Sequence, residues 1–267
     1  MIARLTLVPT MVCATAMAGI RSGKAVAHWL VESATCEAGR PMKTAILLIH
    51  DSGWHSYWIN PGEAGVKTSV SWKLPPGWKS GGLGFPNPRR FTTSDLVGFG
   101  YEGEVLFPVT VTPPEDFNGN ARLSAEISWL ACGEQGCVPG KAEIHLDLSA
   151  GAFKPVTEAK EIQDAYLKLP RPAGNSPQLA VTEKDKQLIL TIQTAPGEIF
   201  DPEGREFFPA TPDMVDPRTP IRFLKTNERW TAEVTKSEYA ASPVKMLSLV
   251  AGPFGRHEPI ELSWTAP

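Results

Sequence analysis

Residues 122–148 read RLSAEISWLACGEQGCVPGKAEIHLDL, and this stretch decides the fold. Apolar and polar residues alternate over 122–129 and again over 141–148, which is the period of a β-strand with one buried face. Between these runs, four residues (Gly-Glu-Gln-Gly) separate Cys132 from Cys137, a length typical of a hairpin loop. The stretch therefore predicts an antiparallel hairpin whose two cysteines face each other closely enough to form a disulfide.

Further short strands surround this hairpin in the first half of the chain. The expected strands are 44–50, 54–59, 69–72 and 105–111, and they are separated by clusters of Pro, Gly, Asn and Asp. The 25 Pro and 23 Gly among 267 residues argue against long helices, and the 42% hydrophobic content argues against disorder. We predict an all-β fold, with an antiparallel sandwich over residues 28–155.

The pattern changes after residue 155. Apolar residues at helical spacing from Ile162 to Leu169 predict one short amphipathic helix, with Thr157 as its N-cap and Pro170 as its end. With PRPAGNSP at 170–177, this helix forms a helix and linker segment over 156–177. Strands are expected again at 188–192, 221–224, 230–234, 244–250 and 260–264, so residues 178–267 predict a second, smaller β domain.

Residues 1–27 have the features of a secretory signal peptide. Arg4 precedes an uncharged apolar run over 5–20, and Ala25-Val26-Ala27 supplies small residues for a cleavage site. The alternative is a retained anchor, although the run is short for a membrane span. Removing this segment takes away three basic residues and moves the formal net charge from −3 to −6. We therefore expect an exported, periplasmic protein that is soluble after cleavage and does not bind nucleic acid.

Three cysteines remain once Cys13 is removed with the leader, and an oxidising compartment favours their pairing. Cys132 and Cys137 are the expected pair, and Cys36 is left over in a turn-like segment. Cys36 is expected to be inert, with a free exposed thiol or an intermolecular disulfide partner as the alternatives. A loop of about six residues gains only about 2 kcal/mol from a disulfide. The spacing alone leaves a structural and a catalytic bond both open. A metal site has weaker support because zinc needs further ligands and no His or Cys cluster is near.

Three ordered motifs resemble the N-terminal periplasmic domain of the DsbD/ScsB thiol:disulfide interchange proteins. They are GWHSYWINPGEAG at 53–65, GYEGEV at 100–105 and WLACGEQGCVPG at 129–140. The resemblance spans roughly residues 40–150 and continues more weakly through Phe207-Phe208-Pro209. It departs from the best-known members by having four rather than five residues between the cysteines, and no Cys-x-x-Cys occurs in the chain.

The resemblance implies an immunoglobulin-like sandwich that carries a redox-active pair, Cys132 and Cys137, with Cys137 as the attacking thiol. It implies a protein-disulfide reductase component that takes electrons from a separate or fused polytopic membrane reductase. The partners it would reduce are thioredoxin-like periplasmic proteins with disulfides, and no cofactor is expected. The alternative function is a non-catalytic exported sandwich that binds a partner and holds only a structural disulfide.

Seven further residues are candidates for supporting roles, each with a structural alternative. The family shields its disulfide with an aromatic on a mobile loop, and Phe85, Phe91 and Phe99 in the Gly/Pro-rich segment 81–100 could supply it or could be core residues. His55 could assist proton transfer and Tyr57 lies on the same expected strand, while Tyr101 and Glu102 match the second motif. Glu102 could tune a thiol pKa or stabilise a turn. Neither a serine-hydrolase motif nor a phosphate loop is present in the sequence.

Overall fold

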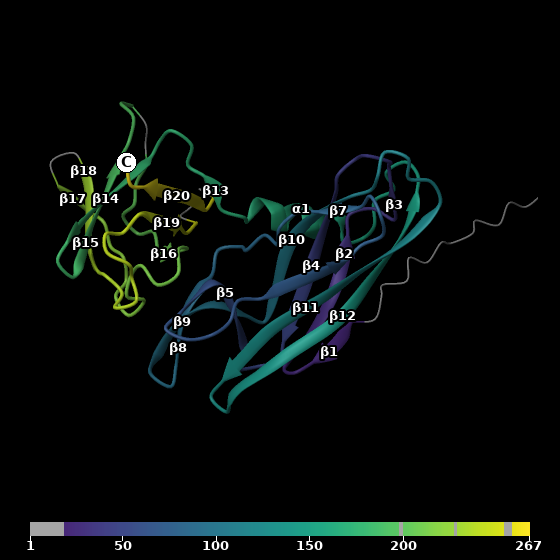
Figure 1. Ribbon diagram of the computed structural model, residues 1–267, viewed down its shortest axis with the longest axis horizontal. Helices are drawn as coiled ribbons and strands as arrows, with labels where there is room; N and C mark the ends of the chain where they lie inside the picture. The colour runs from purple at the N-terminus through teal and green to yellow at the C-terminus, as the bar shows by residue number, and fades with distance from the viewer. Residues whose placement is uncertain (1–18, 198–199, 227–228, 254–257) are drawn as a thin grey trace, which may run out of the picture.

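The hairpin is the longest element of the computed structural model (Figure 1), which describes residues 19–197, 200–226, 229–253 and 258–267. Strand β11 (Asn120–Gly133) pairs with β12 (Gly136–Ala150) without a break from Asn120↔Ser149 to Gly133↔Gly136. The expected strands at 122–129 and 141–148 fall inside these two strands. The ladder extends beyond both predicted runs, because the residues that flank them also pair across the two strands.

Two sheets form the large domain around this hairpin. The first has the order β1-β2-β4-β10-β7, with strands Ile20–Ser22, Ala25–Val31, Met42–His50, Glu104–Thr112 and Lys79–Ser80. The second has the order β3-β12-β11-β5-β9-β8, with β6 also pairing β11, and its remaining strands are Thr35–Cys36, His55–Gly62, Leu96–Glu102, Arg89–Thr93 and Ser69–Lys73. The fold is the predicted all-β, immunoglobulin-like sandwich.

The core of the large domain lies between these sheets. Leu123, Ala125, Ile127 and Trp129 of β11 are 3% exposed or less and point into it, whereas the polar residues between them point outward. Because side chains alternate between faces of a strand, this alternation also fixes which face carries Cys132. Cys132 lies on the outer face, away from the main core.

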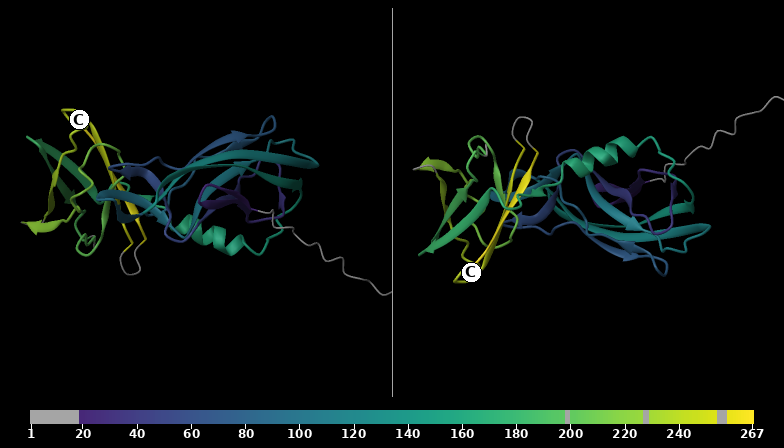
Figure 2. Two further views of the ribbon diagram at one scale, coloured as in Figure 1. Left: turned by 90° about the horizontal axis from the view of Figure 1, so that it is seen from below. Right: turned by 90° about the horizontal axis from the view of Figure 1, so that it is seen from above.

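The helix α1 (Ala159–Leu167) covers part of the outer face of the five-stranded sheet (Figure 2). Its apolar face buries Ile162 and Ala165, and the Tyr166 hydroxyl lies 3.1 Å from Oγ1 of Thr110 on β10. The predicted N-cap, Thr157, is wrong: Glu158 occupies this position, and no side chain caps the helix. The buried face fixes the position of the helix, so a capping hydroxyl is not needed.

The second domain has its own core between two four-stranded sheets. One sheet has the order β13-β20-β19-β16, with strands Arg171–Pro172, Ile260–Thr265, Met246–Ala251 and Phe207–Pro209. The other has the order β14-β15-β18-β17, with strands Gln178–Lys184, Gln187–Gln193, Arg229–Thr235 and Leu224–Thr226. The sequence prediction missed β13, β14 and β16. The strand expected at 221–224 overlaps β17 only at Leu224, and residue 221 forms an isolated bridge. Short strands with proline or few alternating residues carry too weak a periodic signal.

Strand β2 includes residues 25–27, which form the end of the expected signal peptide. Residues 1–18 lie outside the described residues, but β2 pairs with β4 from Ala25↔His50 to Val31↔Thr44, and Ala25 and Ala27 are fully buried. A boundary at residue 27 would cut β2 in half.

We predict that shortening the chain to begin at residue 28 destabilises the large domain, because it removes β1 and the buried first half of β2. Relative to a chain that begins at residue 19, we expect a loss of at least about 2 kcal/mol, or about 4–8 °C in Tm. Thermal unfolding of the two proteins measures the difference. Equal Tm values would show that residues 19–27 are not part of the folded sandwich.

Candidate active site at the tip of the hairpin

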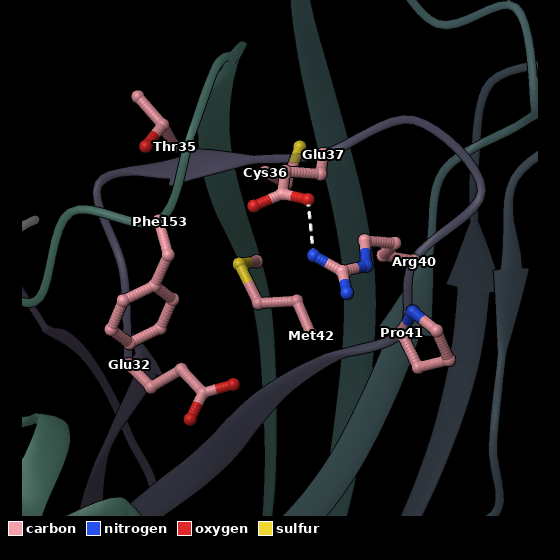
Figure 3. Close-up of a pocket in the computed structure, with 8 residues that line it drawn as sticks. All are labelled: Glu32, Thr35, Cys36, Glu37, Arg40, Pro41, Met42 and Phe153. Atoms are coloured by element: carbon pink, nitrogen blue, oxygen red, sulfur yellow. Dashed lines mark hydrogen bonds and ion pairs between the residues drawn. The ribbon is translucent and has the colours of Figure 1, made fainter.

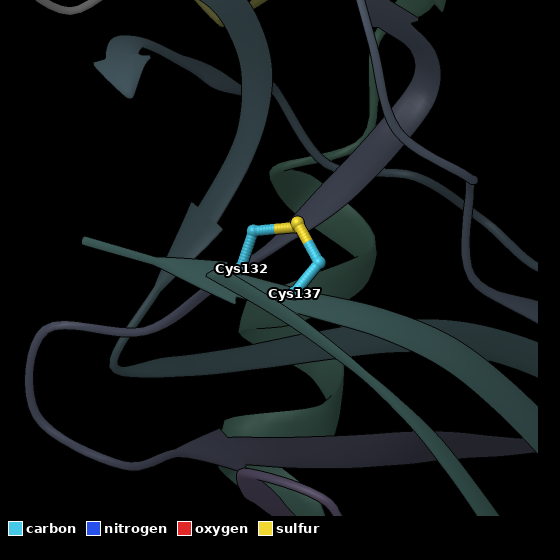
Figure 4. Close-up of a disulfide and its surroundings, with 2 residues drawn as sticks. All are labelled: Cys132 and Cys137. Carbon is cyan, nitrogen blue, oxygen red and sulfur yellow. A yellow bond between two sulfur atoms is a disulfide. The ribbon is translucent and has the colours of Figure 1, made fainter. Parts of the chain in front are cut away.

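The hairpin ends in a disulfide between Cys132 and Cys137, which are direct partners in the β11–β12 ladder (Figure 4). Their Cα atoms are 4.1 Å apart. Beyond them Gly133 still pairs with Gly136, so the turn contains only two residues rather than the four expected from the sequence. Gly136 has φ of 114°, and this backbone conformation, which favours glycine, allows one further pair before the chain reverses.

The two cysteines differ in accessibility. Cys132 is 1% exposed, whereas Cys137 is an exposed residue. Thiol exchange proceeds by attack on one sulfur atom, and access helps to decide which sulfur reacts. A thiol that approaches this disulfide from solvent therefore meets Cys137 first, and Cys132 is shielded behind it.

A row of side chains runs from the disulfide across the outer face of the sheet. Cys132 pairs with His55 on β5, and His55 pairs in turn with Glu102 on β9. Directly paired residues project from the same face, with neighbouring strands about 4.8 Å apart. His55 is thus the immediate neighbour of Cys132, and the exposed Glu102 lies one strand further away.

His55 sits in an aromatic cluster on this face. The centroid of its ring is 3.8 Å from that of Phe91 and 5.3 Å from that of Tyr57, and the Phe91 and Tyr57 centroids are 5.8 Å apart. Phe91 lies on β8 opposite Gly98 of β9, and a Cβ atom on Gly98 would meet the Phe91 ring at 2.3 Å. The missing side chain lets Phe91 lie across β9 against His55. The sequence analysis did not single out Gly98, although a glycine inside a strand often marks such a close approach.

Burial controls the ionisation of this cluster. His55 is 3% exposed, and burial, aided by the nearby His50, lowers its pKa from 6.5 to about 4. Its Nε2 atom is buried and makes no hydrogen bond. Burial also raises the pKa of the Tyr57 hydroxyl. At neutral pH the disulfide therefore has an uncharged imidazole beside it, with an unused buried nitrogen.

The other predicted residues lie away from the disulfide. Phe99 and Tyr101 point into the core from β9. The Tyr101 hydroxyl donates to the carbonyl oxygen of Pro86 at 2.7 Å, and burial raises the pKa of this hydroxyl well above its usual value. Phe85 packs on Phe107, with ring centroids 5.5 Å apart. Of the three candidate phenylalanines, only Phe91 shares the face of the disulfide.

Cys36 lies in a separate place, at β3, beside a pocket of about 270 Å³ (Figure 3). It is 3% exposed, and burial raises the pKa of its thiol. The Glu37–Arg40 ion pair lies along the pocket rim. A buried thiol with a raised pKa is a poor nucleophile, which accords with the expectation that Cys36 is inert.

Within the described residues, no group of three or more His, Cys, Asp or Glu side chains has a geometry that could hold a metal ion. The same part of the chain contains no helix long and apolar enough to cross a bilayer.

Together, the fold and the site define a class: an immunoglobulin-like sandwich with an accessible disulfide at the tip of one hairpin. Residues 31–149 match the family described as the N-terminal domain of the thiol:disulfide interchange protein DsbD. The three sequence motifs all lie within this match, so it confirms the resemblance that they predicted.

Among solved structures, the N-terminal periplasmic domain of ScsB from Proteus mirabilis aligns with a TM-score of 0.64 and 17% identity, covering 91% of this chain and 93% of that chain. The shared fold therefore extends over both β domains. The sporulation control protein Spo0M from Bacillus subtilis aligns over 92% of this chain and 91% of that chain, but with a TM-score of 0.24 and 8% identity. No curated protein sequence matches the chain.

The buried, neutral His55 predicts a specific dependence of stability on pH. The unfolded chain binds a proton at His55 below pH 6.5, whereas the folded chain does so only near pH 4. The contribution of His55 to the free energy of unfolding is therefore complete above pH 6.5 and declines as the pH falls towards 4. We expect His55 to account for a loss of up to about 3 kcal/mol in the free energy of unfolding.

Urea unfolding at pH 7.5 and pH 4.5 tests this on the wild-type chain and a His55→Phe variant. The variant keeps His50, whose pKa burial also lowers, so the difference between the two proteins isolates His55. The variant should lose less stability on acidification. An equal loss in both proteins would contradict a neutral buried His55.

Proposed function

We propose that this chain is a periplasmic thiol-disulfide interchange module that reduces disulfides of partner proteins through Cys132 and Cys137. The observation that carries the proposal is the asymmetric disulfide at the hairpin tip, exposed at Cys137 and buried at Cys132, in a domain of the DsbD N-terminal family. A disulfide at this position adds little to stability, because the ladder already closes the hairpin on both sides of it.

The reaction follows from the two accessibilities. In the reduced module, the Cys137 thiolate attacks one sulfur of a partner disulfide, which forms a mixed disulfide and releases the other partner sulfur as a thiolate. The Cys132 thiolate then attacks Sγ of Cys137 and releases the second partner sulfur. Two electrons pass to the partner, and the Cys132–Cys137 bond forms again.

His55 and Phe91 have roles in this scheme. When the disulfide is reduced, the Cys132 thiol gains a proton beside the neutral imidazole of His55, whose Nε2 has no other partner. Accepting a hydrogen bond from that thiol would prepare it to lose its proton in the resolving step. Phe91 covers His55 and restricts solvent on that side. Glu102, exposed one strand further along, would add a carboxylate that tunes proton affinity in the same row.

The partners follow from the family. Thioredoxin-like periplasmic proteins that hold disulfides would be the electron acceptors, and a polytopic membrane reductase, separate or fused, would be the donor. The apolar run at 5–20 would direct export. No cofactor is required, because each step exchanges one sulfur–sulfur bond for another.

Single cysteine variants test the proposal with an oxidised thioredoxin-like protein as substrate. Cys132→Ser keeps the attacking thiol but lacks the resolving one, so it should accumulate a mixed disulfide visible as a larger band on a non-reducing gel. Cys137→Ser should form much less of this adduct, because Cys132 is 1% exposed.

Turnover should fall to background in both variants, while Cys36→Ser should react like the wild-type chain. Equal trapping by the two variants would contradict the assignment of Cys137 as the attacking thiol. If neither variant forms an adduct and both retain wild-type turnover, the disulfide is structural and the non-catalytic binding function applies.

A further inference from the structure

The N-terminal hairpin, formed by β1, β2 and the turn between them, lies beside strand β12 (Figure 1). The Ser22 hydroxyl accepts a hydrogen bond from the backbone N–H of Lys141 at 3.0 Å. At Gly23 the two backbones approach so closely that a Cβ atom would lie 3.0 Å from the carbonyl oxygen of Pro139. Pro139 and Lys141 follow Cys137 by two and four residues, so the N-terminal hairpin holds β12 directly after this cysteine.

A second segment, the 51–54 turn, holds the other strand of the β11–β12 hairpin next to Cys132. A backbone hydrogen bond of 3.0 Å between its last and first residues closes this turn. Gly133 packs against it, since a Cβ atom on Gly133 would lie 2.6 Å from the carbonyl oxygen of Gly53 and 3.4 Å from Cδ2 of Trp54. Strand β5 begins directly after the turn, and its first residue is the ladder partner of Cys132.

The N-terminal hairpin and the 51–54 turn are joined to each other. The backbone N–H of Asp51 donates to the carbonyl oxygen of Lys24 at 2.9 Å, and Nη1 of Arg21 donates to the Asp51 carboxylate at 2.7 Å. The Lys24 ammonium lies 5.0 Å from the centroid of the Trp54 ring, where the π system attracts a cation. The two segments therefore form one connected network around the end of the hairpin that carries the disulfide.

This network matters most when the disulfide is reduced. Among the strands of the described residues, β12 pairs with β11 and, at Ser149 and Ala150 alone, with β3 at the far end of the hairpin. The ends of a ladder open most easily, and in the dithiol form only non-covalent contacts keep the two cysteines opposed. Contacts that hold both strand ends therefore raise the effective concentration of one thiol at the other.

We propose that the N-terminal hairpin and the 51–54 turn keep Cys132 and Cys137 opposed in the dithiol form and thereby lower the reduction potential of the pair. Ser22 and Lys24 are the positioning residues, because their side chains join the network to β12 and to the turn. A lower potential makes the dithiol a stronger reductant, as donation of electrons to a partner requires. This inference rests on the proposed function and adds to it the residues that set its driving force.

Equilibration with dithiothreitol tests the proposal without a protein partner. The two thiols of one dithiothreitol give up two electrons and two protons and close into the oxidised ring, and Cys132 and Cys137 take up both to become thiols. The full chain is equilibrated at several ratios of reduced to oxidised dithiothreitol. The dithiol fraction is then read by mass spectrometry from the two additional alkylated thiols.

Three variants change the positioning residues. Ser22→Ala removes the acceptor for the Lys141 N–H, and Lys24→Met removes the cation over Trp54 but keeps an unbranched side chain. Lys24→Arg keeps a cation at the same place and serves as the conservative rescue. Thermal unfolding establishes that each variant is folded.

Two control variants make the same changes away from the disulfide. Lys43→Met removes an ammonium that lies 5.2 Å from the centroid of the Tyr166 ring, which matches the Lys24–Trp54 contact. Ser149→Ala removes a hydroxyl that donates to the Asn120 side chain at the other end of the β11–β12 hairpin.

We expect Ser22→Ala and Lys24→Met each to raise the equilibrium constant for reduction about threefold, which is the range of one lost hydrogen bond or cation–π contact. The double variant should raise it about tenfold, a shift of about 30 mV towards a less negative potential. Lys24→Arg and both controls should keep the wild-type potential. If the double variant does not fold, the two single variants decide the outcome.

A wild-type potential in the folded double variant would overturn the proposal. An equal shift in the two controls would also overturn it, because the shift would then follow from a general loss of stability. The proposed function fails on different results, namely the absence of partner adducts together with unchanged turnover in the cysteine variants. The shift between variants is measured whether or not the chain reduces a partner, so the two failures are distinguishable.

Discussion

The structure depends on the register of β11 against β12. Their unbroken ladder places Cys132 opposite Cys137 and turns Leu123, Ala125 and Ile127 into the core. A shift of one residue would turn these apolar side chains outward and move Cys132 to the inner face. The burial of the core therefore holds the Cys132–Cys137 pair in position, and the energy that stabilises the fold also fixes the geometry of the candidate site.

The same alternation gives the two faces of each neighbouring strand different roles. On β9, Phe99 and Tyr101 fill the core while Gly98 makes room for Phe91 on the other face. On β8 and β16, one residue contacts the core of the large domain while its neighbour serves the disulfide face or the second core. A small number of short strands thereby connects the second domain, the core and the surroundings of Cys132.

Alternation in the sequence was strong enough to predict the hairpin, the all-β fold and the cysteine pair. It could not predict β8 or β9, because the segment 81–100 is rich in Gly and Pro and its strands show little periodicity. The local sequence does not distinguish the three phenylalanines of that segment. Only the contacts that each makes in the folded chain show that Phe91, and not Phe85 or Phe99, lies on the face of the disulfide. The packing of Phe208 in the core of the large domain depends on contacts between residues about 110 or more positions apart, which local patterns do not encode.

The reduction potential of the Cys132–Cys137 pair tests the central claim most directly. Equilibration of the purified chain with glutathione or dithiothreitol buffers, followed by alkylation of free thiols, gives its value. A redox-active pair predicts a potential above about −300 mV, in the range where thioredoxin-like proteins exchange electrons. A potential well below about −300 mV would mean that the bond is a stable structural link, and it would contradict the account.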